Sequence, residues 1–510
     1  MVLVVLDDSE LYDASKPFPL HQIVRIVRCL KVVLFKSLQQ DPDLFTDLKS
    51  SPASAVLADL YSRWARRPFS SSALWEIPVS RHETNSSSFK AEIQQHTPVS
   101  VTLLRTMPWA VDFHERMKLF RATLDAERLQ IQGSNDYLSG GPQRSRGVIV
   151  RVRKTRVLED GMEAMARVGA AIKDRVVVKY INDFGEEEAG IDAGGLFKDF
   201  VTDLSGRIFD PSYGLFSTTP SNLLYPNPSA AVLFDPHEMD TMFVFLGRVL
   251  GKALFENITL QPQFAHFFLA FMHGKYNYMN LINDLHTLDP ELYKNLMFLK
   301  TYEGDIADLG LTFAVTDTAM GGQKEVELLP GGAAMDITSQ NRHRYINLAA
   351  KYYLHDRIKR QAKAFFSGLH QVVGTELLGM FCAPELQILI SGSQAGLSVD
   401  DLRAHTRYAG GYLSVDRHVL RFWSVFAELS VEDQAALLKF VTSCERPPSL
   451  GFASLQPPFT IQRVDCSDDQ RLPTASTCFN ILKLPTYSSS KVMREKLLQS
   501  IHSKAGFDLS

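Results

Sequence analysis

A run of small residues divides this chain into two unequal parts. The segment Ser391-Gly392-Ser393-Gln394-Ala395-Gly396 follows an apolar stretch over 377–390 and precedes a segment with its own hydrophobic residues. Glycine and serine allow large changes in φ and ψ at little energetic cost, so this run is typical of an interdomain hinge. The chain of 510 residues is therefore expected to form two to four structural units rather than one core.

The composition is that of an ordinary globular protein and argues against several partners. Hydrophobic residues make up 45% of the chain, charged residues 22%, and the formal net charge is -3. This charge gives no reason to expect nucleic acid or an anionic membrane as a partner, and no apolar run is long enough for membrane insertion. The five cysteines are scattered and form no CxxC pair, which argues against a disulfide framework or a zinc site. A reducing, cytoplasmic location is expected.

Residues 1–105 are expected to form a helical N-terminal extension. Apolar residues at three- and four-residue spacing run from Leu20 to Leu34, and a second stripe runs from Leu57 to Trp64. So short a helical segment does not bury both stripes by itself, so we interpret it as the remnant of a larger upstream region. Further along, the pattern predicts strands over 148–153 and 176–181 and long helices over 241–256 and 262–273.

One cysteine near the C-terminus carries the strongest chemical signal. Cys478 lies in the segment LPTASTCFN (472–480), which is rich in small and hydroxyl-bearing residues. A thiolate is a strong nucleophile near neutral pH, and nearby hydroxyls and backbone N–H groups stabilise it or the oxyanion formed when it attacks a carbonyl. The spacing alone also fits a buried, unreactive cysteine, which is the commoner role of a free thiol.

Six segments, in their order along the chain, resemble those of HECT-type ubiquitin-protein ligases. They are GEEEAGIDAGGLFKDF (185–200), FDPSYGLF (209–216), FLGRVLGKALFENI (245–258), ELQILISG (385–392), FVTSCERPPSLGF (440–452) and LPTASTCFN, and the terminal GFDLS (506–510) agrees as well. The resemblance implies a bilobal α+β catalytic domain. A large, mainly helical N-lobe is expected over 106–391, a hinge over 392–397 that includes Gly392, Ser393 and Gln394, and a small α/β C-lobe over 398–510.

The resemblance also implies the reaction and its residues. In this family an E2 conjugating enzyme delivers ubiquitin to a cysteine as a thioester, and the ubiquitin then passes to a substrate lysine. Cys478 is expected to form the glycyl thioester with Thr477 beside it, while Phe507 and Asp508 in the C-terminal tail support transfer to lysine. Ser476 stands where many members carry a histidine, so local activation by an imidazole is not expected. No metal or organic cofactor is implied.

The partners implied by the resemblance are an E2 enzyme, ubiquitin and protein substrates of unknown identity. The E2-binding subdomain is expected over about 256–350, with Tyr302, Asp305, Asp308 and Leu309 near the docking groove. A non-covalent ubiquitin site over Tyr213–Tyr225 is less well supported, since residues 217–220 differ from those of members that have one.

Two rival functions fit the same cysteine. A cysteine hydrolase would pair Cys478 with a distant histidine such as His405, His418 or His502 and would not need an E2 enzyme. A catalytically silent scaffold would keep the fold and only bind ubiquitin or its carriers. A basic cluster between Arg144 and Arg156 lacks interleaved aromatic residues, so we interpret it as a solvated strand face or a partner of the acidic run 186–188.

Overall fold

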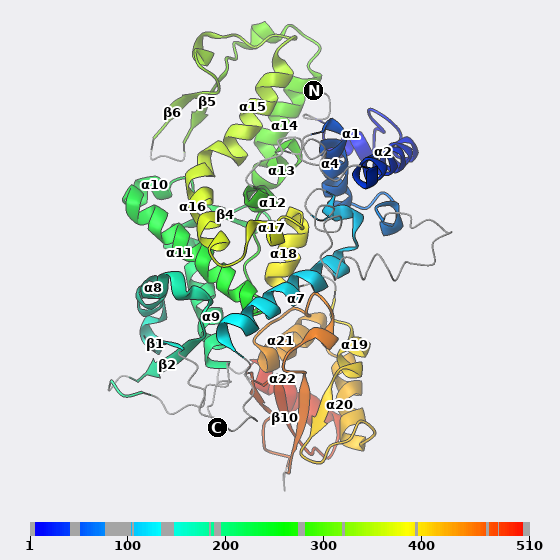
Figure 1. The fold of residues 1–510 in the computed structure, drawn as a ribbon, viewed down its shortest axis with the longest axis vertical. Coiled ribbons are helices and arrows are strands. Elements are labelled where there is room, and N and C mark those ends of the chain that lie inside the picture. The colour runs from blue at the N-terminus through cyan, green and yellow to red at the C-terminus, as the bar shows by residue number, and fades with distance from the viewer. Residues whose placement is uncertain are drawn as a thin grey trace. The chain divides into compact units, whose positions relative to one another are not determined.

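The computed structural model describes residues 6–40, 51–76, 104, 107–133, 147–182, 185–187, 195–273, 281–318, 322–392, 396–465, 469–477 and 479–502 (Figure 1). Contacts divide the chain into two compact units, each built from segments that are far apart in sequence. The first unit comprises residues 1–123, 209–251 and 263–387, and the second comprises 124–208, 252–262 and 388–510. The linear domain boundaries expected from the sequence stay a prediction.

The first unit is mainly helical. Its helices are α1 (Asp8–Tyr12), α2 (Leu20–Gln40), α4 (Pro52–Arg66), α10 (Ala230–Leu233), α12 (His266–Leu269), α13 (Leu281–Leu288), α14 (Pro290–Thr301), α15 (Arg342–Leu354), α16 (Lys359–His370) and α17 (Thr375–Leu378). Two antiparallel hairpins join them, β3 (Phe216–Thr218) with β4 (Leu224–Pro226) and β5 (Ala314–Asp317) with β6 (Lys324–Glu327). Three further helices, α7 (Phe113–Gln132), α11 (Pro236–Phe255) and α18 (Ala383–Ser391), contain residues of both units.

Aromatic side chains fill the core of the first unit. Phe209 and Phe216, both from the FDPSYGLF segment, pack edge to face with centroids 5.4 Å apart, and Phe264 and Phe365 lie against them. Such pairs favour tilted arrangements because the ring edge is positive and the ring face negative. Figure 1 shows α11 and α16, the helices beside this cluster, running next to each other.

Glycines set the spacing of α11 and α16. A Cβ on Gly247 of α11 would lie 1.9 Å from the Phe365 carbonyl oxygen, and a Cβ on Gly368 of α16 would lie 2.0 Å from the Val244 carbonyl oxygen. No side chain fits at those distances, so both positions require glycine. The two helices therefore touch backbone to backbone.

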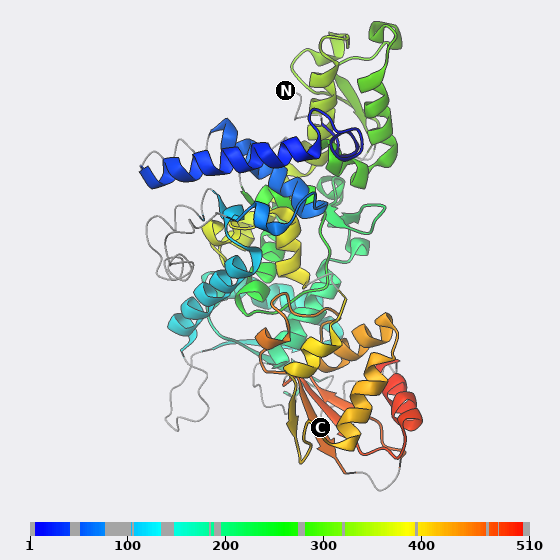
Figure 2. The ribbon, with the colours of Figure 1, turned by 90° about the vertical axis from the view of Figure 1, so that its right-hand side faces the viewer.

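The second unit combines two small sheets with helices. β1 (Val148–Arg153) pairs parallel with β2 (Val176–Ile181), and α8 (Val157–Val168) and α9 (Gly195–Ile208) pack beside them. The C-terminal sheet has the order β7-β8-β10-β9, formed by β7 (Arg407–Ala409), β8 (Thr460–Val464), β10 (Ile481–Pro485) and β9 (Thr474–Ser476). Its helices are α19 (Val399–Ala404), α20 (Arg417–Ala427), α21 (Val431–Thr442) and α22 (Ser490–His502). Figure 2 shows these helices, orange to red, against the strands.

Buried and more exposed side chains alternate along β8 and β10, the central strands of the C-terminal sheet, and this alternation decides which face the helices cover. In β10, Leu482 and Leu484 are fully buried, and so is Ile461 of β8. They pack in one cluster with Phe422 and Phe426 of α20. Side chains two residues apart lie on the same face of a strand, so these residues form one apolar face of the sheet. The helices pack against this face. The expected α+β class is confirmed.

The prediction of a helix over 262–273 is wrong for residues 262–265, because α12 begins at His266. Residues before His266 are extended instead: the Leu224 N–H donates to the Gln263 carbonyl (2.7 Å), and the Ala265 N–H donates to the Leu224 carbonyl (2.8 Å). This pairing with β4 uses backbone groups that a helix would need internally. The two predicted strands, over 148–153 and 176–181, are confirmed.

Candidate functional site

The residues on either side of Cys478 connect two strands of the C-terminal sheet. β9 ends at Ser476 and pairs antiparallel with β10, which begins at Ile481. The Phe479 N–H donates to the Ser476 carbonyl (3.1 Å), which closes the connection. Asn480 has φ of 53°, a left-handed conformation that asparagine adopts more readily than most residues. Cys478 itself lies outside the described residues, so the site is built from its neighbours.

A carboxylate from α9 contacts this connection within the second unit. The Thr477 hydroxyl lies 3.4 and 3.5 Å from the two carboxylate oxygens of Asp199, and the Ser443 hydroxyl lies 3.3 Å from one of them. Burial raises the pKa of Asp199, although Lys198 and the two hydroxyls act in the opposite direction. A carboxylate with a raised pKa beside the cysteine-bearing loop is suited to accept a proton from an incoming group.

The sequence did not single out Asp199 as a functional residue. It belongs to the motif GEEEAGIDAGGLFKDF, and this membership was the one signal that pointed to it. Its partner Thr477 lies 278 positions further along the chain. Only the fold brings the two segments together.

Asn480 holds the other end of the loop. Its side chain is 1% exposed, and its amide Nδ2 donates to the Pro457 carbonyl at 2.6 Å. Its Oδ1 lies 3.4 Å from the Lys198 ammonium, and its backbone carbonyl accepts from the Thr460 N–H at 2.9 Å. These bonds fix the amide and leave little freedom for the loop to slide along the sheet.

The structure describes only some of the other residues predicted for catalysis or for the hinge. Thr477 is buried beside Asp199, whereas Phe507, Asp508, Ser393 and Gln394 lie outside the described residues. Gly392 follows α18 with φ of 82°, and its N–H donates to the Ile388 carbonyl at 2.9 Å. A left-handed glycine is a common way to end a helix, and here it ends α18 at the start of the predicted hinge.

The four residues predicted to bind an E2 enzyme lie together in the first unit. All are found in the segment 302–309 that follows α14. Asp305 caps a short 3₁₀ helix, η9 (Ile306–Leu309), by accepting from the Ala307 N–H (3.1 Å), and the Tyr302 carbonyl accepts from Arg342 (2.9 Å). Ile306 is buried and Leu309 is 37% exposed. The segment is therefore anchored on one side and open to solvent on the other.

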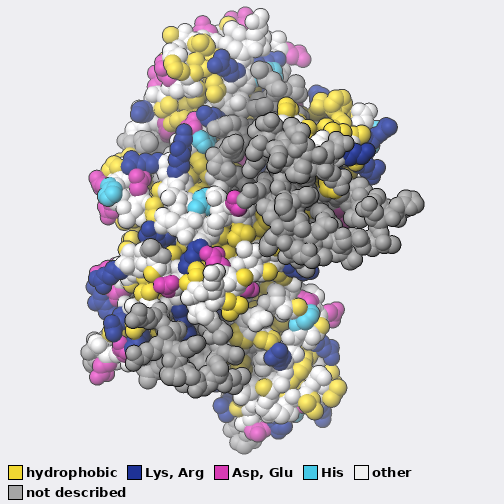
Figure 3. All heavy atoms as spheres, viewed as in Figure 1, with side chains coloured by type: hydrophobic (Ala, Val, Ile, Leu, Met, Phe, Trp, Pro, Cys, Tyr) yellow, Lys and Arg dark blue, Asp and Glu magenta, His cyan; other side chains and the backbone are white. Residues whose placement is uncertain are grey.

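Exposed apolar side chains surround this segment. We define the docking patch as Phe298, Tyr302, Leu309, Leu311 and Met335. Phe298 is 59% exposed and its ring centroid lies 5.4 Å from that of Tyr302, while Leu311 and Met335 belong to neighbouring segments. In Figure 3, hydrophobic and acidic side chains lie side by side at the end of the unit that carries β5, β6 and α15. Clustered exposed apolar residues mark an interaction surface.

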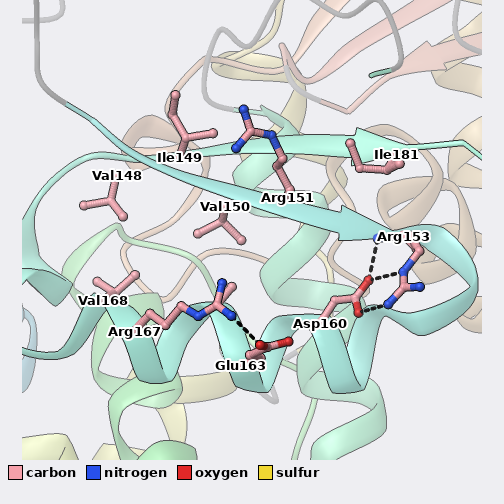
Figure 4. Close-up of a pocket in the computed structure, with 11 residues that line it drawn as sticks. Val148, Ile149, Val150, Arg151, Arg153, Asp160, Glu163, Arg167, Val168 and Ile181 are labelled. Atoms are coloured by element: carbon pink, nitrogen blue, oxygen red, sulfur yellow. Dashed lines mark hydrogen bonds and ion pairs between the residues drawn. The ribbon is translucent and has the colours of Figure 1, made fainter. Parts of the chain in front are cut away.

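A pocket of about 450 Å³ lies between β1 and α8 in the second unit (Figure 4). Three arginines line it, and each is paired: Arg153 with Asp160 at 2.6 Å, Arg167 with Glu163, and Arg151 with Glu187 at 3.1 Å. Of the basic cluster, Arg151 pairs with the acidic run and Arg153 with Asp160 of α8, whereas Arg144 and Arg146 lie outside the described residues. The pocket offers little unpaired positive charge to a phosphate.

Two of the three histidines considered for a hydrolase have local carboxylate partners. His405 lies 3.0 Å from Asp401, and His502 lies 2.8 Å from Asp433. For His418, burial and three neighbouring arginines lower the pKa. Among the described residues no group of His, Cys, Asp and Glu is arranged to hold a metal ion, and no helix is long and apolar enough to cross a bilayer.

Comparison with known proteins identifies the family. Residues 202–510, more than half of the chain, match the HECT-domain (ubiquitin-transferase) model, so the chain belongs to the HECT family. It is 38% identical to the E3 ubiquitin-protein ligase UPL6 of Arabidopsis thaliana and 36% identical to the ubiquitin-protein ligase E3B of Homo sapiens, over 100% of this chain and 50% of each relative. It is 32% identical to the E3 ubiquitin-protein ligase HUL5 of Saccharomyces cerevisiae, over 61% of that relative.

These matches confirm the resemblance of the motifs to HECT ligases, including E3B. The chain spans about half the length of the first two relatives. The matched proteins are ubiquitin ligases, and neither a hydrolase nor a silent scaffold gains support from them.

Proposed function

We propose that this chain is the catalytic part of an E3 ubiquitin transferase. It accepts ubiquitin from an E2 enzyme as a thioester on Cys478 and transfers it to lysines of protein substrates. Membership of the HECT family is the observation that carries the proposal. The partly buried contact between Asp199 and Thr477, the residue before that cysteine, supports it.

In the first step, the Cys478 sulfur attacks the carbonyl carbon of the E2 thioester. A new carbon–sulfur bond forms, the old one breaks, and the E2 cysteine leaves as a thiolate. The two bonds are of similar energy, so the main requirement is to bring the reacting atoms within about 3–3.5 Å. Movement at the hinge over 392–397 would supply that approach.

The second step needs a proton acceptor. A lysine attacks as the neutral amine, so its ammonium group must first lose a proton. Asp199, beside Thr477, and Asp508 in the tail are the candidate acceptors. Asp199 has the stronger support, since burial raises its pKa toward the range in which a carboxylate is an effective base.

The E2 enzyme is proposed to dock on the docking patch. Aromatic and aliphatic side chains in the centre with acidic residues such as Asp305 and Asp308 at the rim suit a modest, reversible interface. A cytoplasmic location belongs to the same proposal, because ubiquitin, its activating enzyme and ATP must all reach the protein.

The test is a ubiquitin-loading reaction with activating enzyme, a panel of E2 enzymes and ATP, analysed on non-reducing gels. We expect a thiol-sensitive adduct that requires an E2 enzyme and is lost in C478S but kept in C444S. Cys444 is the matched control, a half-buried thiol that accepts a hydrogen bond from Thr259 at 3.1 Å. Absence of an adduct across a broad E2 panel with folded protein would contradict the proposal, and release of free ubiquitin without an E2 enzyme would favour the hydrolase.

A further inference from the structure

The N-terminal helix α1 is bonded to the helical hairpin that leads to the docking patch. The Asp8 N–H donates to the Asn283 side chain of α13 at 2.7 Å. On α14, the Tyr293 hydroxyl donates to the Asp7 carboxylate at 3.2 Å, and Lys300 forms an ion pair with Glu10. Figure 1 shows α1 and α4 beside α13 and α14, all of them in the first unit.

Two arginines of α4 extend these contacts into a buried network. The Arg63 side chain is fully buried and pairs with Asp8 at 3.0 Å and with Asp59 at 3.2 Å. Arg66 pairs with Asp284 of α13 at 3.1 Å. A buried charge that loses its partner is strongly destabilising, so α1, α4 and α13 hold one another in a defined arrangement.

The same helix, α4, is bonded to the core of the first unit. The Tyr61 hydroxyl donates to the Glu385 carboxylate at 2.5 Å, and the Arg116 guanidinium binds both oxygens of that carboxylate at 2.6 and 2.8 Å. Burial alone would raise the pKa of Glu385, but Arg116 and Tyr61 hold it below its usual value. Helix α4 therefore joins α7 and α18 to the hairpin α13–α14.

The contacts with α1 and the docking patch lie on different faces of α14. Tyr293 and Lys300 are seven residues apart, close to two full turns, so they share the face that meets α1. Phe298 lies about 140° around the helix from Tyr293 and is 59% exposed. The N-terminal segment thus contacts α14 on one side and leaves the docking patch uncovered.

We propose that residues 6–40 and 51–76 form a brace that positions the hairpin α13–α14, and with it the docking patch, for the E2 enzyme. The segment supports the first step of the reaction and does not block it. Asp8, Glu10, Arg66 and Lys300 are positioning residues, since they act through the hairpin α13–α14. This inference rests on the proposed function, because it takes the E2 enzyme to bind at the docking patch.

The test uses a charge reversal with a matched control on another helix of the first unit. K300E places a carboxylate against Glu10, whereas K363E makes the same change at an exposed position of α16, away from the docking patch. E10Q is the rescue variant. Glu10 is the N3 residue of the capping box of α1, a position where glutamine also caps the helix. The change therefore removes the repulsion between residues 10 and 300 and keeps the cap.

Two quantities are measured on the full chain: the initial rate of ubiquitin loading against the concentration of ubiquitin-charged E2, and hydrogen exchange over 290–301. For K300E we expect the half-saturating E2 concentration to rise about tenfold with the maximal rate within about twofold, as for lost positioning of a binding surface. Exchange over 290–301 should rise as well. K300E with E10Q should recover both readouts, and K363E should match the wild type.

Unchanged exchange and unchanged half-saturation in K300E would overturn the brace, and so would faster exchange without any change in half-saturation. If K300E does not fold, E10Q alone is measured, and a rise of about two- to threefold in half-saturation is expected for loss of one ion pair. L309E separates this inference from its premise. Impaired loading in L309E with normal loading in K300E would overturn the brace alone, whereas normal loading in L309E would overturn the docking patch.

Discussion

The Thr477 hydroxyl lies 3.4 Å from a carboxylate oxygen of Asp199, so a half-buried acid 278 positions earlier in the chain contacts the residue before Cys478. The contact orients the loop, and its carboxylate is the proton acceptor proposed for the second step. These two roles predict different behaviour in loading and in transfer.

We expect D199N to slow discharge of the loaded ubiquitin onto free lysine by about tenfold or more, as for loss of a general base, while loading from the E2 enzyme stays within about threefold. Because burial raises the pKa of Asp199, the wild-type discharge rate should fall as the pH is lowered through that pKa, and D199N should show a flatter profile. D203N, one turn further along α9, keeps the acceptor and should keep the fall in rate, displaced to lower pH because the Asp203 charge helps to raise the pKa of Asp199. Equal discharge rates for D199N and wild type would remove Asp199 from the mechanism.

Replacing Asn480 should loosen the loop. N480A loses the bond to the Pro457 carbonyl and forces alanine to φ of 53°, so we expect destabilisation of about 1–3 kcal/mol. N480G keeps the backbone conformation and loses only the side-chain bonds, so it should be less destabilised. Thermal melting of both variants checks the order. A larger loss in N480G than in N480A would mean that the left-handed conformation is not the constraint.

The contact between α11 and α16 should not tolerate a methyl group. G247A places a Cβ 1.9 Å from the Phe365 carbonyl oxygen, so we expect the first unit to lose about 3 kcal/mol or more, or to fail to fold. G206A in α9 meets no atom within 4 Å and should be neutral or stabilising by about 0.5–1 kcal/mol. Thermal melting of both proteins distinguishes the cases, and an unchanged melting temperature in G247A would contradict the close approach.

The brace should respond to pH through Asp284. Burial raises its pKa to about 6, with Arg66 and Arg63 opposing and Asp8 adding to the shift. A carboxyl with a raised pKa binds its proton more tightly in the folded state, so its contribution to stability increases as the pH falls from about 7 towards 4. Arg66 is 3.1 Å away and reduces the net effect, so we expect at most about 2–3 kcal/mol.

D284N removes this contribution. Stability is compared as the difference between variant and wild type, since burial lowers the pKa of His266 to about 4 and makes its own contribution fall over the same pH range. The difference should change with pH between 7 and 4. A difference that is constant with pH would show that Asp284 does not titrate there.

Much of the secondary structure could be predicted from local patterns. The strand over 148–153 alternates buried and exposed side chains, and that pattern is visible in its sequence. The helix predicted over 262–273 begins only at His266, since Leu224, nearly forty residues earlier, takes the backbone groups around Phe264. Strand pairing over such a distance leaves no periodic trace in the sequence.

The candidate site divides in the same way. Cys478 and Thr477 stood out by motif, and the segment 302–309 was found through the family resemblance. Asp199 was missed because its role depends on a tertiary contact with Thr477. The contacts of Glu10 with Lys300 and of Arg66 with Asp284 were missed for the same reason, since a charged residue in a helix gives no sign of its partner.

The account's central claim is that ubiquitin is held as a thioester on Cys478. The most direct measurement is mass-spectrometric mapping of the loaded protein after digestion under acidic, non-reducing conditions. The account predicts the C-terminal glycine of ubiquitin on the peptide that contains Cys478, in a bond that thiols cleave, and a thiol-resistant or absent adduct in C478S. A thiol-sensitive adduct on Cys444 or another cysteine, with the Cys478 peptide unmodified, would contradict it.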